Sequence, residues 1–402
     1  MRIKDIAILN PIYSGQDLEN EEVSFSPMEC LRYDVLRTYS IPFSQAKGKY
    51  TYFGNNDVLF AKVTPCFENL NTAIARNLLN GVGFGSSEIN VLRPKENISL
   101  RYIFYLVCSK RFIDNGCASM CGVGGLKRVS PRAINTFEFD LPSLATQKTI
   151  ASYLDKKCGK IGCEIDLLER KVDAYKRLRC SIINRAVTRG INLDISLKSS
   201  GLRWIFYIPV HWQIGRIRNF FDYRNEKVSE NDFMPLSVSK KGVVPQMENV
   251  AKSTAVGDTR KKVCKEDFVV NSRSDRKGSC GISPMDGSVS LIYIVLEPKY
   301  IDPTFVNYYF RCNDWIEEFY RNGKGIVADL WTTNYSVMRN IEIAVPPYAE
   351  QKQIAAYLDD KCGKIDTLIE KIGIKIERLK ELKRSLINEV VTGKRAINTL
   401  EA

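Results

Sequence analysis

The chain contains one long segment twice. Residues 141–188 recur without a gap as residues 345–392, and 23 of the 48 aligned positions are identical. The segments that precede the two copies share little beyond a few short runs, so variable and constant parts alternate along the chain. A repeat of this kind is one structural unit used more than once. The sequence therefore predicts one scaffold that carries two different globular heads.

Each copy of the repeat has the apolar spacing of a long amphipathic helix. Apolar residues recur at steps of mostly three and four, while Lys and Arg fill the other faces. Gly159 and Gly363 mark the natural place for a break, because glycine costs about 1 kcal/mol in a helix interior. Each copy is therefore either one long helix or a short helix followed by a long one. The residues expected to pack between the helices are Ile150, Leu154, Ile161, Leu168, Ile182, Ile354, Leu358, Ile365, Leu368, Ile372, Leu379 and Leu386.

One such helix cannot bury its apolar stripe alone, since about 38 residues span about 57 Å at 1.5 Å per residue. Two copies can bury both stripes by packing antiparallel, which would relate the heads by an approximate two-fold axis. The alternative is two unrelated surface helices, each packed on its own head. The expected fold class is α+β, with two globular heads joined by two long helices in a pseudo-two-fold antiparallel coiled coil. The expected segments are a first head at 1–140, a helical spacer at 141–195, a second head with its linker at 196–344, and a second spacer at 345–402.

Both heads show strand-like runs separated by turns, and two of these runs match between the heads. Residues 56–62 resemble residues 266–272, and residues 137–142 resemble residues 341–346, which lead into the repeat. Apolar and aromatic residues at helical spacing predict helices at Leu100–Ser109 and Pro303–Phe319. A common α+β frame with different loops follows.

The charge of the chain favours a polyanionic partner. The net charge is +13 and the isoelectric point is about 9.1, and neutralising phosphates releases counterions and gives affinity for nucleic acid. A solvated basic surface is the alternative, so the positions of the charges must decide. The loops that differ between the heads combine cations with amides and hydroxyls, which suit phosphates and base edges. The residues expected to contact DNA are Lys47, Lys49, Tyr50, Lys62, Thr64, Asn69, Lys127, Arg128, Lys240, Lys241, Arg260, Lys261, Lys262, Arg273, Arg276, Lys277, Thr333 and Asn334.

The sequence lacks residue patterns that are typical of metal centres, histidine-based catalysis, cofactor binding and membrane insertion. The 12 cysteines include no Cys-x-x-Cys pair, so reduced thiols are favoured over a metal centre. The single histidine, His211, precedes a tryptophan, where a packed or hydrogen-bonded imidazole is expected rather than a catalytic one. The sequence has no glycine-rich cofactor loop, no apolar run for a membrane span and no signal peptide. We therefore expect a cytoplasmic protein without cofactor, metal, catalytic residue or membrane.

The repeated segment carries a recognisable pattern. Gln-x-x-Ile-x-x-Tyr-Leu-Asp occurs at residues 147–155 and 351–359, and Ile-Asn-x-x-Val-Thr closes each copy. Together with Gly201-Leu-Arg-Trp204, Ile208-Pro-Val-His-Trp212 and residues 62–69, it resembles the conserved regions of type I restriction-modification specificity subunits. The resemblance covers essentially the whole chain.

That resemblance implies a non-catalytic DNA-binding subunit of a restriction system. Each head would be a target recognition domain for one half of a split sequence in double-stranded DNA. Residues 147–188 and 351–392 would be spacer helices that also dock two methyltransferase subunits for DNA methylation, and restriction subunits would then join the complex. A two-fold arrangement suits two major-groove half-sites about one helical turn, roughly 34 Å, apart.

The two heads differ in what precedes them. Met1-Arg-Ile-Lys-Asp5 aligns with Gly215-Arg-Ile-Arg-Asn219, so the tryptophan-containing residues 201–212 have no counterpart ahead of the first head. A shortened start, or one product of a rearranging locus, would account for this difference, and it bears on whether the first head is functional.

Two other function classes stay open. One is a methyltransferase or nuclease fused to its own recognition domains. Val345-Pro-Pro-Tyr348 resembles the Asn-Pro-Pro-Tyr motif of amino-methyltransferases, but valine cannot accept the hydrogen bond from a target amine. A strand end followed by a helix start is therefore the favoured interpretation of these residues. The other class is a helical interaction scaffold without a DNA role.

Overall fold

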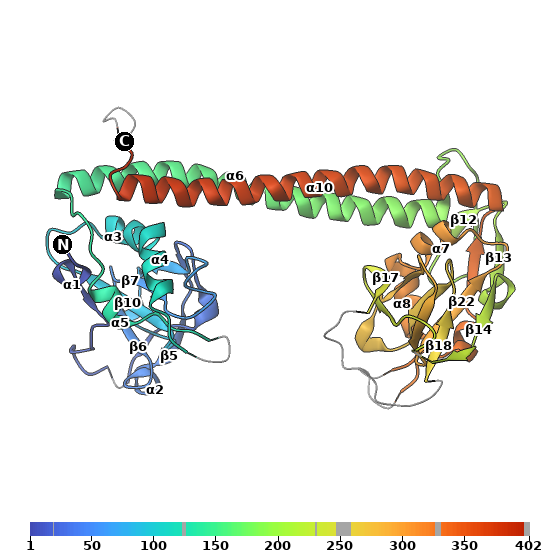
Figure 1. Ribbon diagram of the computed structural model, residues 1–402, viewed down its shortest axis with the longest axis horizontal. Coiled ribbons are helices and arrows are strands. Elements are labelled where there is room, and N and C mark those ends of the chain that lie inside the picture. The colour runs from blue at the N-terminus through green and yellow to red at the C-terminus, as the bar shows by residue number, and fades with distance from the viewer. Residues whose placement is uncertain (19, 123–125, 230, 247–258, 326–330, 398–402) are drawn as a thin grey trace. The chain divides into compact units, whose positions relative to one another are not determined.

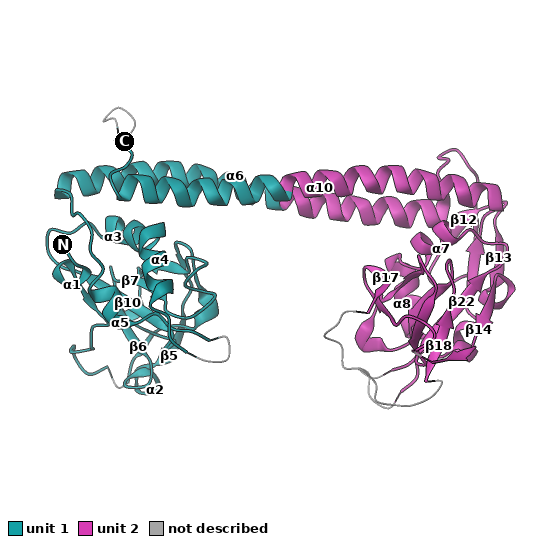
Figure 2. Ribbon diagram, viewed as in Figure 1, with its two compact units in different colours: residues 1–169, 373–402 teal, residues 170–372 magenta. Residues whose placement is uncertain are grey.

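The computed structural model describes residues 1–18, 20–122, 126–229, 231–246, 259–325 and 331–397 (Figure 1). The chain divides into two compact units (Figure 2). Unit 1 comprises residues 1–169 and 373–402, and unit 2 comprises residues 170–372. Each unit therefore contains one β-rich head together with part of each copy of the repeat.

The two copies of the repeat form the long helices α6 (Leu144–Arg189) and α10 (Tyr348–Val391). Both run unbroken through Gly159 and Gly363, so the alternative of a short helix followed by a long one is wrong. A Cβ atom added at either glycine would meet open space, and these glycines therefore cost helix propensity without serving close packing. None of the described helices is long and apolar enough to cross a membrane.

Within each unit the two helices pack antiparallel. In unit 1, Ile150 near the start of α6 shares a buried cluster with Val390 near the end of α10, and the Glu164 carboxylate lies 2.7 Å from Lys375 Nζ. In unit 2, the later α6 residue Arg179 pairs with Asp366 at 3.0 Å. Further along α6, Ile183 and Val187 share a cluster with Ile354 and Leu358. In each unit, higher residue numbers in α6 meet lower residue numbers in α10.

Head 1 contains two four-stranded sheets. The first has the order β1-β10-β7-β8, and all its pairs are antiparallel. The second has the order β5-β2-β9-β6. The strands are β1 (Ala7–Leu9), β2 (Glu22–Ser26), β3 (Leu31–Arg32), β4 (Val35–Leu36), β5 (Tyr39–Pro42), β6 (Thr51–Gly54), β7 (Val58–Ala61), β8 (Thr72–Ile74), β9 (Val82–Gly85) and β10 (Ile89–Pro94). The helices are α1 (Ile3–Ile6), α2 (Phe43–Ala46), α3 (Leu100–Val107), α4 (Lys110–Ala118) and α5 (Pro131–Asn135).

Head 2 repeats the first of these sheets, in the order β14-β22-β19-β20, and adds smaller ones. Its strands are β11 (Leu197–Ser199), β12 (Tyr207–Pro209), β13 (Gln213–Arg216), β14 (Phe221–Arg224), β15 (Lys227–Val228), β16 (Leu236–Ser239), β17 (Gly242–Pro245), β18 (Arg260–Val263), β19 (Phe268–Asn271), β20 (Cys280–Ile282), β21 (Gly287–Ser290), β22 (Tyr293–Pro298) and β23 (Glu342–Val345). Its helices are α7 (Pro303–Tyr309), α8 (Asn313–Arg321) and α9 (Tyr335–Met338).

The matched runs 56–62 and 266–272 become the strands β7 and β19, which take the same place in their sheets. Val58 pairs with Leu92 on one side and Ile74 on the other, and Phe268 pairs with Leu296 and Ile282. Every residue of both strands is buried, which explains their continuous apolar character. The expected α+β fold, with two β-rich domains and two long helices packed together, is confirmed.

The second matched pair of runs differs between the heads. In head 2, β23 pairs with β13 over four residues. In head 1, the corresponding Glu138 makes an isolated bridge with Arg2.

Two further expectations for head 2 need correction. The predicted helix 303–319 is interrupted at residues 310–312, where Cys312 becomes the N-cap of α8. The linker expected at the start of the segment 196–344 contains a strand, because β11 pairs with β12, and the following Leu202 and Trp204 are buried in the core of unit 2.

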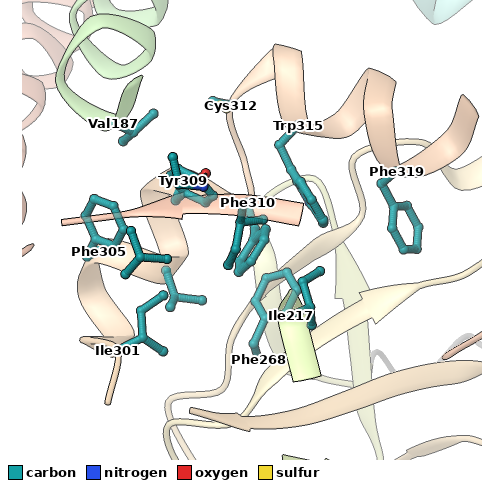
Figure 3. Packing of buried hydrophobic residues seen from close by; sticks show 14 of the residues in the cluster. Val187, Ile217, Phe268, Ile301, Phe305, Tyr309, Phe310, Cys312, Trp315 and Phe319 are labelled. Carbon is teal, nitrogen blue, oxygen red and sulfur yellow. Dashed lines mark hydrogen bonds between the residues drawn. The ribbon is translucent and has the colours of Figure 1, made fainter. Parts of the chain in front are cut away.

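That core is rich in aromatic residues (Figure 3). The rings of Phe310 and Trp315 lie edge to face with centroids 4.4 Å apart, and Phe268 packs on Phe310 at 5.0 Å. Val187 of α6 belongs to the same cluster. The hydrophobic core of head 2 therefore includes side chains of the long helices.

Candidate nucleic-acid interface

Each head is anchored to the long helices by the same glutamine. Gln147 Oε1 accepts a hydrogen bond from Ser99 N at 2.9 Å, and its Nε2 donates to Pro142 O at 2.9 Å. Gln351 repeats both bonds, accepting from Asp302 N at 2.7 Å and donating to Pro346 O at 2.9 Å. Both side chains are almost fully buried. Since Ser99 and Asp302 are the N-caps of α3 and α7, the bonds fix these two helices against the repeat.

A tyrosine and an aspartate make a second matched anchor. Tyr105 OH donates to Asp155 Oδ1 at 2.6 Å, and Tyr308 OH donates to Asp359 Oδ1 at 2.7 Å. Burial, and then the hydrogen bond to the carboxylate, raise the pKa of both phenols well above its usual range. The Gln and Asp positions belong to the sequence motif, but the motif alone does not give their role. Their identical spacing in both copies was the signal that could have revealed it.

The expected packing residues of the helices differ in exposure. Ile150, Leu154, Ile354, Leu358, Ile365 and Leu386 are buried. Ile161, Leu168, Ile182, Ile372 and Leu379 are half-buried. Leu368 is 41% exposed, so an apolar side chain of the stripe lies at the surface there.

Head 1 brings several of the expected DNA contacts together where two loops meet. Thr64 N donates to Lys127 O at 3.0 Å, and Lys127 N donates to Thr64 Oγ1 at 3.2 Å. Next to them, Arg128 makes a bidentate pair with Glu88, whose pKa it lowers, and the charge of Lys62 acts on the same carboxylate. Lys127 and Arg128 are exposed, so this loop pair presents cations at the surface.

The remaining head 1 residues lie elsewhere in the head. Lys47, Lys49 and Tyr50 occupy the exposed connection between α2 and β6. Lys47 Nζ lies 3.6 Å from the Asp17 carboxylate, and the Tyr50 ring packs edge to face on Phe25. Asn69 is exposed in the loop that precedes β8.

In head 2, the run Arg260-Lys261-Lys262 lies on strand β18, and its side chains alternate in burial. Lys261 is buried, and its ammonium donates to Tyr293 O at 2.6 Å and to Tyr223 OH at 3.1 Å. Burial lowers the pKa of Lys261 to about 8. Lys261 thus stabilises the sheet from inside and is not presented to a phosphate. Lys262 lies 3.1 Å from the Glu226 carboxylate and is half-buried.

The other head 2 loops present cations next to carboxylates. Arg273 and Arg276 flank Asp275 at 3.0 and 3.7 Å, and Lys277 lies 2.6 Å from Glu317. Surface ion pairs of this kind are weak, so a phosphate can compete for the cation. Thr333 is buried and donates to Phe319 O at 2.9 Å, whereas the exposed Asn334 is the N-cap of α9.

Two arginines that were not predicted from the sequence, Arg179 and Arg311, lie near these loops. A cavity of about 340 Å³ lies beside the turn after β16. It is lined by Lys240, Lys277, Arg179 of α6 and Arg311. Arg311 Nη2 also donates to Lys240 O at 2.7 Å. The spacing of these residues in the sequence does not predict that a helix and three loops meet there. Lys241 is exposed in the same turn.

The single histidine behaves as expected. His211 Nε2 lies 2.6 Å from Glu350 Oε2, so the imidazole is satisfied by a neighbouring carboxylate. All 12 cysteines are free, and no group of three potential metal ligands occurs among the described residues.

Comparison with known proteins places the chain in a family. Residues 1–164 and 209–378 match the model of the Type I restriction modification DNA specificity domain. The chain belongs to this family. The resemblance expected from the sequence is therefore confirmed.

Curated relatives are specificity subunits. The Type I restriction enzyme EcoEI specificity subunit of Escherichia coli is 33% identical over 158 residues, which cover 38% of this chain and 26% of that protein. The EcoAI specificity subunit of the same species is 35% identical over 149 residues, covering 36% and 25%. The matched part of this chain thus spans about a quarter of the length of these two relatives. The putative MjaX specificity subunit of Methanocaldococcus jannaschii is 25% identical over 332 residues, covering 77% and 71%.

Two solved structures share the fold. A chain from work described as "Structural basis underlying complex assembly and conformational transition of the type I R-M system" superposes with a TM-score of 0.74 at 14% identity, over 98% of this chain and 97% of that one. The HsdS subunit from Thermoanaerobacter tengcongensis superposes with a TM-score of 0.52 at 16% identity, over 98% and 96%. The fold is therefore that of known subunits of this class.

Proposed function

We propose that this chain is the non-catalytic specificity subunit of a type I restriction-modification complex and that each head reads one half of a bipartite DNA target. The observation that carries the proposal is one frame used twice with different loops. The same sheet order and the same glutamine and aspartate anchors occur in both units. The cation-bearing loops on these frames differ in sequence, as two readers of different half-sites require.

The proposed DNA contacts are the exposed loop residues of both heads. Lys127 and Arg128 in head 1, and Arg273 and Arg276 in head 2, are the leading candidates. All four are exposed, and the three arginines pair with partly exposed carboxylates. Lys261 and Thr333 are left out of this set, because both side chains are buried and hydrogen-bonded inside the head.

The long helices are proposed to set the spacing of the half-sites and to dock two methyltransferase subunits, which restriction subunits then join. With 46 residues, α6 is about 69 Å long at 1.5 Å per residue. In this role the chain would work on chromosomal DNA in the cytoplasm and would need no cofactor of its own.

A paired insertion tests the spacing role. One heptad is inserted after Leu368 in α10 and one after Tyr175 in α6, so that the antiparallel helices lengthen together. Seven residues add about 10 Å, or about three base pairs. Methylome sequencing of a host that carries this variant should show the same two half-sites with a spacer about three base pairs longer. An unchanged spacer in a folded and active variant would refute the spacing role.

Head exchange and salt dependence test the reading role. Replacing head 2 alone should change one half-site and leave the other intact. In the complex with methyltransferase subunits, Arg276→Ala should weaken binding to all DNA sequences alike and reduce the salt slope by about one. Binding that is indifferent to salt would favour the interaction scaffold instead.

A test for intrinsic catalysis separates the remaining alternative. The purified chain is incubated with labelled S-adenosylmethionine and DNA that carries the target sequence. We expect no transfer until methyltransferase subunits are added. Methylation by the chain alone would overturn the proposal in favour of a fused enzyme.

A further inference from the structure

The cavity of about 340 Å³ in unit 2 lies where head 2 meets α6, and four cations line it. Arg179 comes from α6, Lys240 from the turn between β16 and β17, Lys277 from the loop before β20, and Arg311 from the connection between α7 and α8. Among the described lining residues, Glu317 is the one carboxylate. The lining therefore carries an excess of positive charge.

Two of the four cations are not neutralised by the protein itself. Arg179 pairs with Asp366 at 3.0 Å, and Lys277 pairs with the lining carboxylate at 2.6 Å. Lys240 and Arg311 make no ion pair with any residue that the structure describes. Arg311 Nη2 instead donates to Lys240 O at 2.7 Å, which holds the turn beside the arginine. Both charges are thus available to an anion from outside the chain.

Unit 1 contains the corresponding place. The N-caps of α3 and α4 match those of α7 and α8, which aligns the two heads here. The hairpin β3–β4 matches the hairpin β16–β17, since each has a two-residue turn and packs beside the last strand of the equivalent sheet, β8 or β20. The repeat aligns the long helices. The corresponding residues are Lys383 and Arg179, Tyr33 and Lys240, Phe104 and Asn307, and Cys108 and Arg311.

In unit 1 this place is filled by an aromatic ring. Tyr33 packs edge to face on Phe104 with centroids 5.5 Å apart, and Lys383 Nζ lies 3.6 Å from the centroid of the Tyr33 ring. Beside them, Arg101 pairs with Asp34 of the same turn at 2.5 Å. Unit 1 therefore closes the place with its own side chains, whereas unit 2 has polar and basic side chains around an open space.

We propose that the cavity of unit 2 binds a phosphate of the DNA backbone, so that the constant helix α6 takes part in DNA binding on the side of head 2. This inference rests on the proposed function. Guanidinium and ammonium groups that converge on one space are the usual partners of phosphate oxygens. A volume of about 340 Å³ is at the lower end of the range of about 300–1,000 Å³ for ligand sites and suits a phosphate with its sugar.

The position of the cavity favours DNA over an acidic segment of a protein partner. Lys277 directly follows Arg276, which belongs to the loop proposed to contact DNA, and Lys277 lines the cavity. The cavity is therefore continuous with that surface, and a DNA strand bound at the loop can extend into it.

Lys240→Ala tests the proposal in the complex with methyltransferase subunits. Lys240 is exposed in a turn, so the variant should fold and keep its thermal transition. The affinity should fall by the same factor for target and unrelated DNA, and the slope of log affinity against log salt should decrease by about one. Lys240→Arg retains the charge and should restore the slope. Lys352→Ala, an equal loss of charge at an exposed position outside the cavity, should leave the slope unchanged.

Neutral phosphate analogues locate the contact on the DNA. Methylphosphonate linkages are introduced one at a time along the target that methylome sequencing identifies, and each removes the charge of one phosphate. For the wild type we expect a linkage on the side of the half-site read by head 2 at which the affinity falls. Lys240→Ala should make binding insensitive to that linkage, and no linkage on the side of head 1 should respond to this substitution.

The inference and the proposed function fail in different ways. If the wild-type complex binds its target with a steep salt slope, and Lys240→Ala changes neither the slope nor the methylphosphonate pattern, the inference alone is refuted. If the wild-type complex shows no salt-dependent DNA binding, the proposed function fails and the inference fails with it.

Two further results would assign the cavity to another occupant and overturn the inference. One is weaker association of Lys240→Ala with the methyltransferase subunits at an unchanged DNA salt slope, which would indicate an acidic segment of that partner. The other is saturable binding of inorganic phosphate to the free wild-type chain, lost in Lys240→Ala, again with an unchanged DNA slope.

Discussion

Replacing Gln351 by methionine tests whether this single side chain holds head 2 to the long helix. Methionine has a similar length and a high helix propensity, so the helix itself should not suffer. The substitution removes both hydrogen bonds of a residue that is 1% exposed. Asp302 N and Pro346 O are then left without their partner inside the protein, because the methionine sulfur cannot donate and accepts only weakly.

The expected loss follows from these two groups. A buried polar group without a partner costs about 1–3 kcal/mol, so the unfolding free energy of unit 2 should fall by about 3 kcal/mol. For a unit of about 200 residues, that corresponds to a decrease in Tm of about 6–12 °C. All four tryptophans of the chain lie in unit 2, so thermal unfolding followed by tryptophan fluorescence reports this unit alone.

Gln147→Met is the matched variant for unit 1. It should lower a transition seen by far-ultraviolet circular dichroism and leave the tryptophan transition in place. Lys352→Met, at an exposed position next to Gln351, is the control and should change neither transition. The reasoning is refuted if Gln351→Met leaves the tryptophan transition unchanged, or if Gln147→Met shifts it equally.

Four other substitutions probe buried, helical and turn positions. The Tyr102 hydroxyl is fully buried and has no hydrogen-bond partner within the part of the chain that the structure describes, while its counterpart in unit 2 is Phe305. Tyr102→Phe should therefore stabilise unit 1 by about 1 kcal/mol and raise the Tm of the circular dichroism transition; a decrease would show that the hydroxyl is bound. Lys261→Met should change the pH dependence of stability. The folded-state pKa of Lys261 is about 8 and its ordinary value is 10.5, so the unfolded chain binds more protons between these two pH values. The unfolding free energy of the wild type, relative to that of the variant, should therefore increase as the pH rises from 7 to 9. A difference in urea unfolding that stays constant with pH would contradict this. Gly363→Ala should stabilise α10 by about 1 kcal/mol, because the added Cβ meets open space. By contrast, Gly393→Ala should destabilise, because this glycine has a φ of +71°; equal denaturation midpoints for the two alanine variants would contradict both expectations.

The parts of the fold that repeat in the sequence could be predicted from it. The long helices follow from apolar spacing over many turns, and the matched strands β7 and β19 follow from short apolar runs that share an aspartate at their start. Asp57 and Asp267 show why that residue recurs. Each is buried and paired with an arginine, Arg93 or Arg224, at 2.7 Å.

The candidate interface was less accessible to sequence reasoning, because a basic run does not reveal its orientation. Arg260, Lys261 and Lys262 were all expected in a loop, but they lie on a strand, and the alternation of strand side chains turns Lys261 into the core. The cavity shared by Lys240 and Arg179 depends on how a helix and several loops approach one another. No local pattern encodes that approach, since it results from packing of segments far apart in the chain.

The two units are built from different parts of the chain. Unit 2 is continuous in sequence, whereas unit 1 combines the first 169 residues with the last 30. In unit 1, Asn388 Oδ1 accepts a hydrogen bond from Arg111 N at 3.2 Å, and Lys383 Nζ lies 3.6 Å from the centroid of the Tyr33 ring. Besides its glutamine and aspartate anchors, head 1 therefore depends on contacts whose closure spans most of the chain and carries the entropy of a long loop. Head 2 packs on helix segments that lie within the same continuous unit. Because α10 supplies those distant contacts, a substitution near its C-terminal end acts on head 1, and the order of the heads along the chain does not tell which head a helix residue supports.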